Sequence, residues 1–199
     1  MKRELGIDGL MLMYVGNLEP YQGIELLLES FALVLKKTEK GDLVIVGGHE
    51  SRIHRYQKKA HHLAIQRRVH FCGPRPLEHL GEYLSEADIL VSPRISGNNT
   101  PMKLYSYLHS GTAILATDLP THTQLLDSRV AVLAEPSPKA FSEAMLRLIE
   151  DENLRRKIGE AGKKLVEEQY SYRAFSGKLR GLFDWLETQV GESRSAERV

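Results

Sequence analysis

Short apolar runs alternate with longer stretches of helical period along most of the chain. Apolar runs bounded by turn residues are typical of parallel strands that are buried on both faces. Between the runs, apolar residues recur every three or four positions, which predicts amphipathic helices. Strands are expected at residues 10–15, 43–46, 69–72, 89–91, 113–116 and 131–133, and helices at residues 24–37, 50–63, 76–85, 101–110, 121–126, 140–149, 154–168 and 172–190.

This alternation predicts an α/β fold: a doubly wound, Rossmann-like parallel sheet with helices on both faces and extra helices at the C-terminus. A chain of 199 residues with 42% hydrophobic residues suits one such domain. We expect residues 1–9 to be a loose polar lead-in and residues 10–190 to form the domain. Residues 191–199 are polar, and we expect a disordered tail there.

One stretch, residues 89–117, carries the most unusual local chemistry. It reads as strand, polar loop, short helix and strand, with Thr100 as the expected N-cap and Pro101 at the first helical position. Lys103 then lies in the first turn, where the helix dipole disfavours a cation. An anion bound at the helix start would explain it, and Arg94 at the end of the preceding strand could point at the same place. Two solvated surface cations are the alternative.

Glycines follow three of the expected strands. Gly16, Gly47 and Gly73 all lie at carboxyl ends of strands, where ligands bind in doubly wound sheets. Glycine lets the backbone approach a ligand closely, although it also simply makes turns. Together with Arg94 and Lys103, the glycines favour a ligand that carries phosphate.

Composition excludes several classes of protein. Lys and Arg total 27 against 26 for Asp and Glu, so the net charge of +1 gives no argument for nucleic acid binding. The single Cys72 rules out internal disulfides and fits a reducing compartment. No apolar stretch is long enough for a membrane span and no signal peptide is visible, so we expect a cytoplasmic protein.

The histidines predict no metal site. Of the five candidates His49, His54, His61, His62 and His70, three lie on the polar helix at residues 50–63, and the five do not form a ligand set at the spacing of a metal site. His122 follows the strand at residues 113–116 and could touch a ligand, but a surface histidine at a helix start is the more ordinary interpretation.

Three segments carry motifs of a known family. Residues 14–31 read YVGNLEPYQGIELLLESF, residues 69–73 and 84–93 read VHFCG and LSEADILVSP, and residues 100–117 read TPMKLYSYLHSGTAILAT. Together they resemble the carboxyl-terminal, donor-binding domain of the GT-B glycosyltransferases, specifically the large retaining family called group 1 or family 4. The resemblance runs from about residue 10 to 190 and implies one half of a GT-B fold. The absence of any Asp-x-Asp sequence argues against the metal-dependent GT-A type.

The chain departs from the resembling family at four positions. That family usually has two glutamates eight positions apart, where this chain has Asn98 and Ser106. It usually has an arginine and a lysine in the first loop, where this chain has Asn17 and Gln22. Asn98 and Ser106 can still hydrogen-bond sugar hydroxyls, and nearby cations could replace the two that are lost. The alternative is that donor binding has weakened or vanished.

The resemblance also implies roles for individual residues. The donor diphosphate would lie against the amino end of the signature helix, where the cations Lys103 and Arg94 would offset the charge of the leaving group. No cofactor or metal is implied, and the substrate would be a UDP-, GDP- or ADP-sugar. The donor-binding residues would be Gly16, Asn17, Gln22, Gly47, Gly73, Asn98, Thr100, Pro101, Met102 and Ser106.

The implied partner is an amino-terminal, acceptor-binding domain. In the resembling family a terminal helix crosses back to that domain, and here the last helix has an apolar stripe at Phe175, Leu179, Leu182, Phe183 and Leu186. Packing of this stripe on the chain's own sheet is equally compatible with the sequence. We expect the isolated chain to transfer no sugar, and the resemblance allows peripheral membrane association of the full-length protein.

Three functions remain open from the sequence. The first is the donor-binding half of a retaining glycosyltransferase with an unknown acceptor. The second is a non-catalytic module of the same fold that binds a nucleotide or nucleotide sugar, which the missing glutamates would permit. The third is an interaction domain without a ligand, in which the glycines serve only turns.

Overall fold

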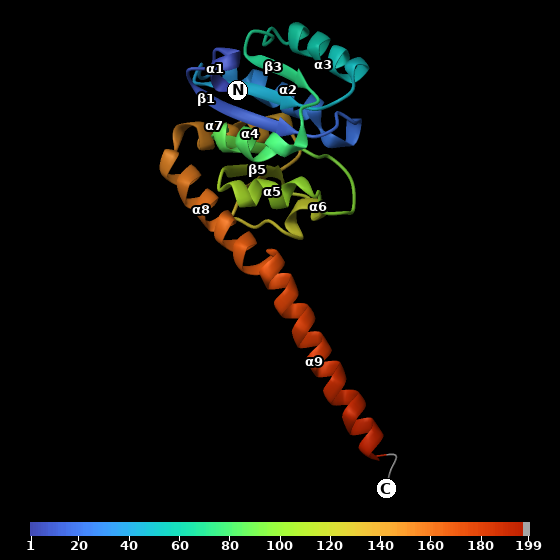
Figure 1. Ribbon diagram of the computed structural model, residues 1–199. Helices are drawn as coiled ribbons and strands as arrows, with labels where there is room; N and C mark the ends of the chain where they lie inside the picture. The colour runs from blue at the N-terminus through green and yellow to red at the C-terminus, as the bar shows by residue number, and fades with distance from the viewer. Residues whose placement is uncertain (197–199) are drawn as a thin grey trace.

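The computed structural model describes the backbone of residues 1–196 and the side chains of residues 1–189. Within them, six strands form one sheet in the order β3-β2-β1-β4-β5-β6, and every neighbouring pair is parallel (Figure 1). The predicted α/β fold and all six predicted strands are therefore confirmed. The strands are β1 Leu10–Val15, β2 Gly41–Val46, β3 Val69–Gly73, β4 Ile89–Ser92, β5 Ala113–Thr117 and β6 Val132–Ala134.

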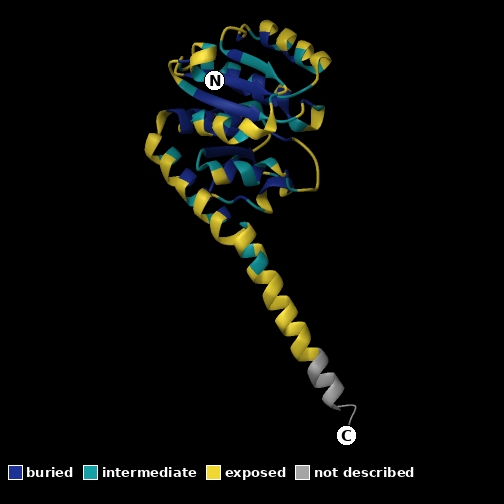
Figure 2. Ribbon diagram, viewed as in Figure 1, coloured by how far each residue is buried: buried dark blue, intermediate teal, exposed yellow. Residues whose placement is uncertain are grey.

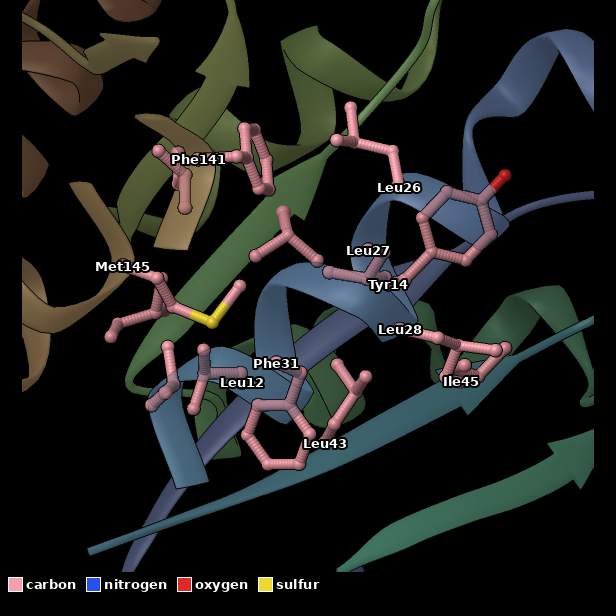
Figure 3. Close-up of a cluster of buried hydrophobic side chains, with 14 of the residues drawn as sticks. Leu12, Tyr14, Leu26, Leu27, Leu28, Phe31, Leu43, Ile45, Phe141 and Met145 are labelled. Atoms are coloured by element: carbon pink, nitrogen blue, oxygen red, sulfur yellow. The ribbon is translucent and has the colours of Figure 1, made fainter. Parts of the chain in front are cut away.

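Helices cover both faces of the sheet. The α-helices are α1 Lys2–Leu5, α2 Ile24–Leu35, α3 Glu50–His62, α4 Leu80–Glu86, α5 Lys103–Ser110, α6 Pro120–Thr123, α7 Pro138–Glu150, α8 Glu152–Gln169 and α9 Tyr172–Ala196, with 3-10 turns η1 Pro20–Gln22 and η2 Leu77–His79. Helices α2, α3 and α7 supply one apolar core, and α4, α5 and α8 supply the other. Figure 3 shows part of the first core, where Phe31 of α2 lies against Leu12 and Leu43 of the central strands.

The strand order reverses direction between β1 and β4. The chain leaves β1 for α2 on one face and leaves β4 for α5 on the other, and ligands of doubly wound sheets bind at such a reversal. The two loops touch, because the N–H of Ile95 donates to the carbonyl of Tyr21 at 2.9 Å. A Cβ on Gly23 would lie 1.9 Å from the carbonyl oxygen of Pro93, so only glycine permits this approach.

The expected loose lead-in is wrong. Residues 2–5 form α1, and its start is fixed by contacts with residues more than eighty positions away. The N-terminal ammonium lies 2.9 Å from Glu86, and the Nζ of Lys2 lies 2.6 Å from Asp88. Ile7 is buried in the second core, which holds the segment on the domain.

Helix α9 projects away from the domain (Figure 1). The predicted apolar stripe does not pack on the chain's own sheet: Phe175, Leu182 and Phe183 are 60%, 51% and 56% exposed, and Trp185 beside them is 58% exposed. Figure 2 shows this exposure along the described part of the helix. The backbone is helical to residue 196, beyond the predicted end at residue 190, and residues 197–199 of the predicted disordered tail lie outside the described residues.

Candidate functional site

Lys103 is the first residue of α5, and its side chain reaches under the glycine turn that follows β1. The residue as a whole is partly exposed, but its Nζ is buried and has no hydrogen-bond partner within the described residues. Nζ lies 3.9 Å from the centre of the Tyr14 ring, a cation–π distance. A Cβ on Gly16 would lie 3.7 Å from Nζ, which places the amine directly beneath that turn.

The surroundings of Lys103 offer its amine no acceptor. The hydroxyl of Tyr14 donates to the carbonyl of Asn17 at 2.6 Å, and the hydroxyl of Tyr107 accepts from the N–H of Val15 at 2.9 Å. No ion pair within the described residues includes Lys103. Burial, and secondarily the positive charge of Arg94, therefore lower the pKa of Lys103 from 10.5 to about 7. An anion at this place would reverse that effect.

The start of α5 differs from the prediction. The N-cap is Met102 rather than Thr100, because the hydroxyl of Thr100 donates to the Oε1 of Gln124 at 2.9 Å instead of capping the helix. Pro101 lies in the turn before the helix, and its carbonyl accepts from the N–H of Leu104. The N–H groups of Met102 and Lys103 have no acceptor in the described part of the chain. Free N–H groups beside a buried amine form a setting suited to a phosphate.

The three predicted strand-end glycines come together. The N–H of Gly16 donates to the carbonyl of Val46 at 3.0 Å, and the N–H of Gly47 donates to the carbonyl of Gly73 at 2.7 Å. A Cβ on Gly47 would lie 2.2 Å from the carbonyl oxygen of Gly16, and its φ of +106° also favours glycine. The glycine turns after β1, β2 and β3 thus lie side by side at the carboxyl edge of the sheet.

Arg94 is placed differently from the prediction. Its side chain is buried and turned toward the chain itself: Nη1 donates to the carbonyl of Asn99 at 2.9 Å and to the hydroxyl of Thr121 at 3.1 Å. The guanidinium also lies over the ring of Tyr21, 5.0 Å from its centre. Only Nε remains buried and unpartnered. Arg94 therefore holds the loop before α5, and most of the N–H donors of its guanidinium group are not available to a ligand.

Unpartnered buried atoms gather at the predicted site. Within the described residues, four buried side-chain nitrogen or oxygen atoms have no hydrogen-bond partner, and three of them belong to Gln22, Arg94 and Lys103. Buried polar atoms are normally hydrogen-bonded, so such a concentration in residues predicted to bind a ligand needs an explanation. A polar ligand at this edge would supply one.

The remaining predicted residues lie at the rim. Asn17, Asn98 and Met102 are exposed, and the carbonyl of Asn98 accepts from the amide of Gln124 at 3.3 Å. Ser106 lies one turn along α5 from Lys103 and lines a hollow of about 610 Å³ between α4, α5 and the start of α9. Tyr105 and Leu80 also line this hollow, whereas Lys103 and Gly16 do not.

His122 is a residue that sequence reasoning placed wrongly. It is fully buried rather than on the surface, in α6 behind the loop that Arg94 holds. Its Nδ1 lies 2.9 Å from the carbonyl of Thr117 and its Nε2 lies 2.9 Å from the hydroxyl of Ser92. Burial lowers the pKa of His122 to about 4. The one clue in the sequence is that Ser92 and Thr117, the polar partners of the buried ring, stand at the ends of two predicted strands.

The described residues include no group of three or more histidine, cysteine or acidic side chains that could hold a metal ion. Among the described residues, no helix is long and apolar enough to cross a membrane. The candidate site consists of one buried amine, free backbone N–H groups and glycine turns.

Comparison with known proteins shows which sequences and structures the chain resembles. A family model described as glycosyl transferases group 1 matches residues 2–165. A D-inositol 3-phosphate glycosyltransferase of Corynebacterium glutamicum is 24% identical over 194 residues, covering 92% of this chain and 46% of the relative. An uncharacterized glycosyltransferase of Methanocaldococcus jannaschii is 23% identical over 177 residues, covering 88% of this chain and 45% of the relative. The chain thus spans about half the length of the curated relatives it matches.

Solved structures share the fold. The Anabaena protein HepE in complex with UDP-glucose superposes with a TM-score of 0.81 at 14% identity, covering 92% of this chain and 51% of HepE. The C-terminal domain of a group 1 glycosyl transferase, LpcC from Francisella tularensis, gives a TM-score of 0.75 at 21% identity, covering 85% of this chain and 91% of that domain. The predicted resemblance to the carboxyl-terminal half of a GT-B fold is confirmed.

Proposed function

Because the chain belongs to the group 1 glycosyl transferases, we propose that it is the donor-binding half of an enzyme that moves a sugar from a nucleotide-sugar donor to an acceptor. The observation that carries the proposal is the buried, unpartnered amine of Lys103 beneath Gly16, beside free N–H groups at the start of α5. This arrangement suits a diphosphate, and HepE, which shares the fold, was solved with UDP-glucose.

The chemistry follows from the charge that develops during transfer. As the bond between the sugar and the donor phosphate breaks, negative charge grows on the departing diphosphate. The buried ammonium of Lys103 and the N–H groups of Met102 and Lys103 would stabilise that charge. We also propose retention at the sugar, in line with the family that the motifs resemble, and no covalent nucleophile is assigned to this half.

The diphosphate and the nucleoside of the donor would bind at two different places along α5. Lys103 and the glycine turns would hold the diphosphate, and Ser106 lines the neighbouring hollow with the ring of Tyr105 and the side chain of Leu80. A hydroxyl beside aromatic and apolar groups suits a nucleoside, whose sugar needs hydrogen bonds and whose base needs packing. We propose that the nucleoside lies on that side of the site.

The exposed face of α9 supports a second half. Leu179, Leu182 and Leu186 share one face of the helix with Phe175 and Phe183, and all five are at least 39% exposed. A continuous apolar stripe of this size is typical of a surface that another domain covers. We propose that the acceptor-binding half packs on it, and that the 199-residue chain alone transfers no sugar.

Nucleotide binding is tested by titrating the chain with UDP, GDP and ADP and following backbone amide shifts. We expect at least one of them to shift the amides of Gly16, Gly73 and Met102. No shift near these residues with any of the three would overturn the proposal. Turnover of a nucleotide sugar and a sugar acceptor by the chain alone would refute its dependence on a second half.

A non-catalytic module that binds the same ligands is the second candidate. It is favoured by Asn98 and Ser106, where the family usually has glutamates. Both candidates predict the amide shifts, so activity of the two-domain protein separates them.

A further inference from the structure

We propose that His122 is a positioning residue: it fixes the loop of residues 93–102 between β4 and α5, and through that loop the start of α5 that carries Lys103. The role in ligand binding rests on the proposed function, whereas the fixing of the loop does not. None of the sequence motifs assigned His122 a part in the site.

The contacts of His122 define one neutral form of its ring. The carbonyl of Thr117 can only accept, so Nδ1, which lies 2.9 Å from it, must carry the proton. Nε2 is then an acceptor and receives the hydroxyl proton of Ser92 at 2.9 Å. The charged groups that act on the ring are Arg94 and Lys103, and both oppose a positive imidazole.

His122 and its neighbours are tied to the loop at two points. The hydroxyl of Thr117, 3.0 Å from Nδ1 of His122, donates to the carbonyl of Arg94 at 2.5 Å. The hydroxyl of Thr121, the residue before His122 in α6, donates to the carbonyl of Asn99 at 2.7 Å. The side chain of Arg94 closes the arrangement by donating to Asn99 and Thr121.

These ties matter because most of the loop is exposed, and its other bonds join it to Tyr21 through Ile95 and to Gln124 through Asn98 and Thr100. Residues 95–99 are all exposed, and Gly97 adopts a φ of +125°. Exposed loops of this composition are normally mobile. Because this loop is held at Arg94 and Asn99, the start of α5 has a fixed position. The free N–H groups of α5 and the side chain of Lys103 therefore stay at the carboxyl edge of the sheet. The buried ring of His122 bonds to the ends of both β4, through Ser92, and β5, through Thr117.

The main test compares His122→Phe, which keeps an aromatic ring but removes both hydrogen bonds, with the control His61→Phe, at an exposed position on α3. We expect amide hydrogen exchange of residues 95–100 to rise by about tenfold or more in His122→Phe, since each lost buried hydrogen bond is worth about that factor. UDP should bind that variant about tenfold more weakly or worse, and the control should match the wild type. Partial rescue by His122→Asn, whose amide can still donate to Thr117, is expected.

Two further measurements keep the inference testable if His122→Phe does not fold. Nitrogen-15 spectra of the wild type at pH 7 should show a neutral His122 protonated on Nδ1, and the opposite tautomer or an imidazolium would overturn the inference. If His122→Phe fails to fold, Ser92→Ala removes one of the bonds, and wild-type loop exchange in it would also overturn the inference. Failure of the wild type to bind any of UDP, GDP and ADP would refute the proposed function alone, because loop exchange still reports on His122.

Discussion

Replacement of Lys103 by methionine is the sharpest test of the anion site. The Lys103→Met side chain keeps the length of the buried stem and removes the charge. Burial lowers the pKa of Lys103 from 10.5 to about 7, and one pKa unit corresponds to about 1.36 kcal/mol. Holding the charged amine in the folded protein therefore costs roughly 5 kcal/mol relative to the unfolded chain. The variant is relieved of that cost.

The sign of the stability change depends on pH. Between about pH 7 and 10.5 the unfolded chain binds a proton at Lys103 that the folded chain lacks, so the unfolding free energy of the wild type rises with pH in this window. Below about pH 7 both states are protonated and the full cost is present. Urea unfolding should therefore show Lys103→Met to be more stable than the wild type at about pH 6, with a smaller difference at about pH 9.

Ligand binding should change in the opposite direction. A diphosphate beside Nζ favours the charged amine, so binding above about pH 7 takes up a proton, and the UDP affinity of the wild type should fall by at most tenfold per pH unit. At neutral pH, Lys103→Met should lose about 1.5–3 kcal/mol of UDP binding, or roughly 10- to 150-fold, the range for hydrogen bonds to charged groups. Uridine binding should be unaffected.

Calorimetric titration with UDP and uridine at several pH values measures these effects. Lys58→Met removes an exposed lysine on α3 and serves as the control. Equal losses for uridine and UDP would show that Lys103 supports the loop and not the anion. A wild-type UDP affinity that stays flat between about pH 7 and 9 would refute the linkage between the amine and the phosphate.

Three further changes test other parts of the argument. Arg94→Gln should cost less UDP affinity than Lys103→Met, because most of the Arg94 fork is already bonded to Asn99 and Thr121; equal losses in calorimetry would contradict this. Gly47→Ala should lower the unfolding free energy by at least about 1–3 kcal/mol, because its φ is strained and its Cβ meets a backbone oxygen, whereas Gly81→Ala, which meets nothing, should not destabilise. Leu182→Asp should change the urea unfolding of this chain by less than about 0.5 kcal/mol but destabilise the two-domain protein.

The sheet could be predicted because its information is local. Each strand is an apolar run, and each helix has its own period, so all six strands and the order of the long helices follow from short windows of sequence. The meeting of Gly16, Gly47 and Gly73 also follows, since parallel strands bring their carboxyl ends to one edge. Lys103 was found because it contradicts a local rule about helix dipoles.

What could not be predicted depends on contacts between distant residues. Helix α1 forms because the N-terminus meets Glu86 and Asp88, and nothing within residues 1–9 signals those contacts. Thr100 has the side chain of an N-cap, but Gln124 of a later turn takes its hydroxyl, so α5 begins at Lys103. The prediction that Arg94 faces the ligand was also wrong because of distant contacts. Its actual acceptors lie in the loop before α5 and in α6, and the local sequence pattern does not fix where these two segments lie.

The substitutions relative to the family are balanced in charge, which bears on whether the site still binds a diphosphate. Two usual glutamates are replaced by Asn98 and Ser106, and two usual cations by Asn17 and Gln22, so the site loses as much negative charge as positive. Lys103 then remains as the one buried amine without a partner in the described residues, and no carboxylate competes with a phosphate for it. A site that had merely decayed would have no reason to keep such an amine, because burying it costs stability. The cost is consistent with selection for an anion, whereas the loss of the ribose carboxylate bears on how tightly the nucleoside is held.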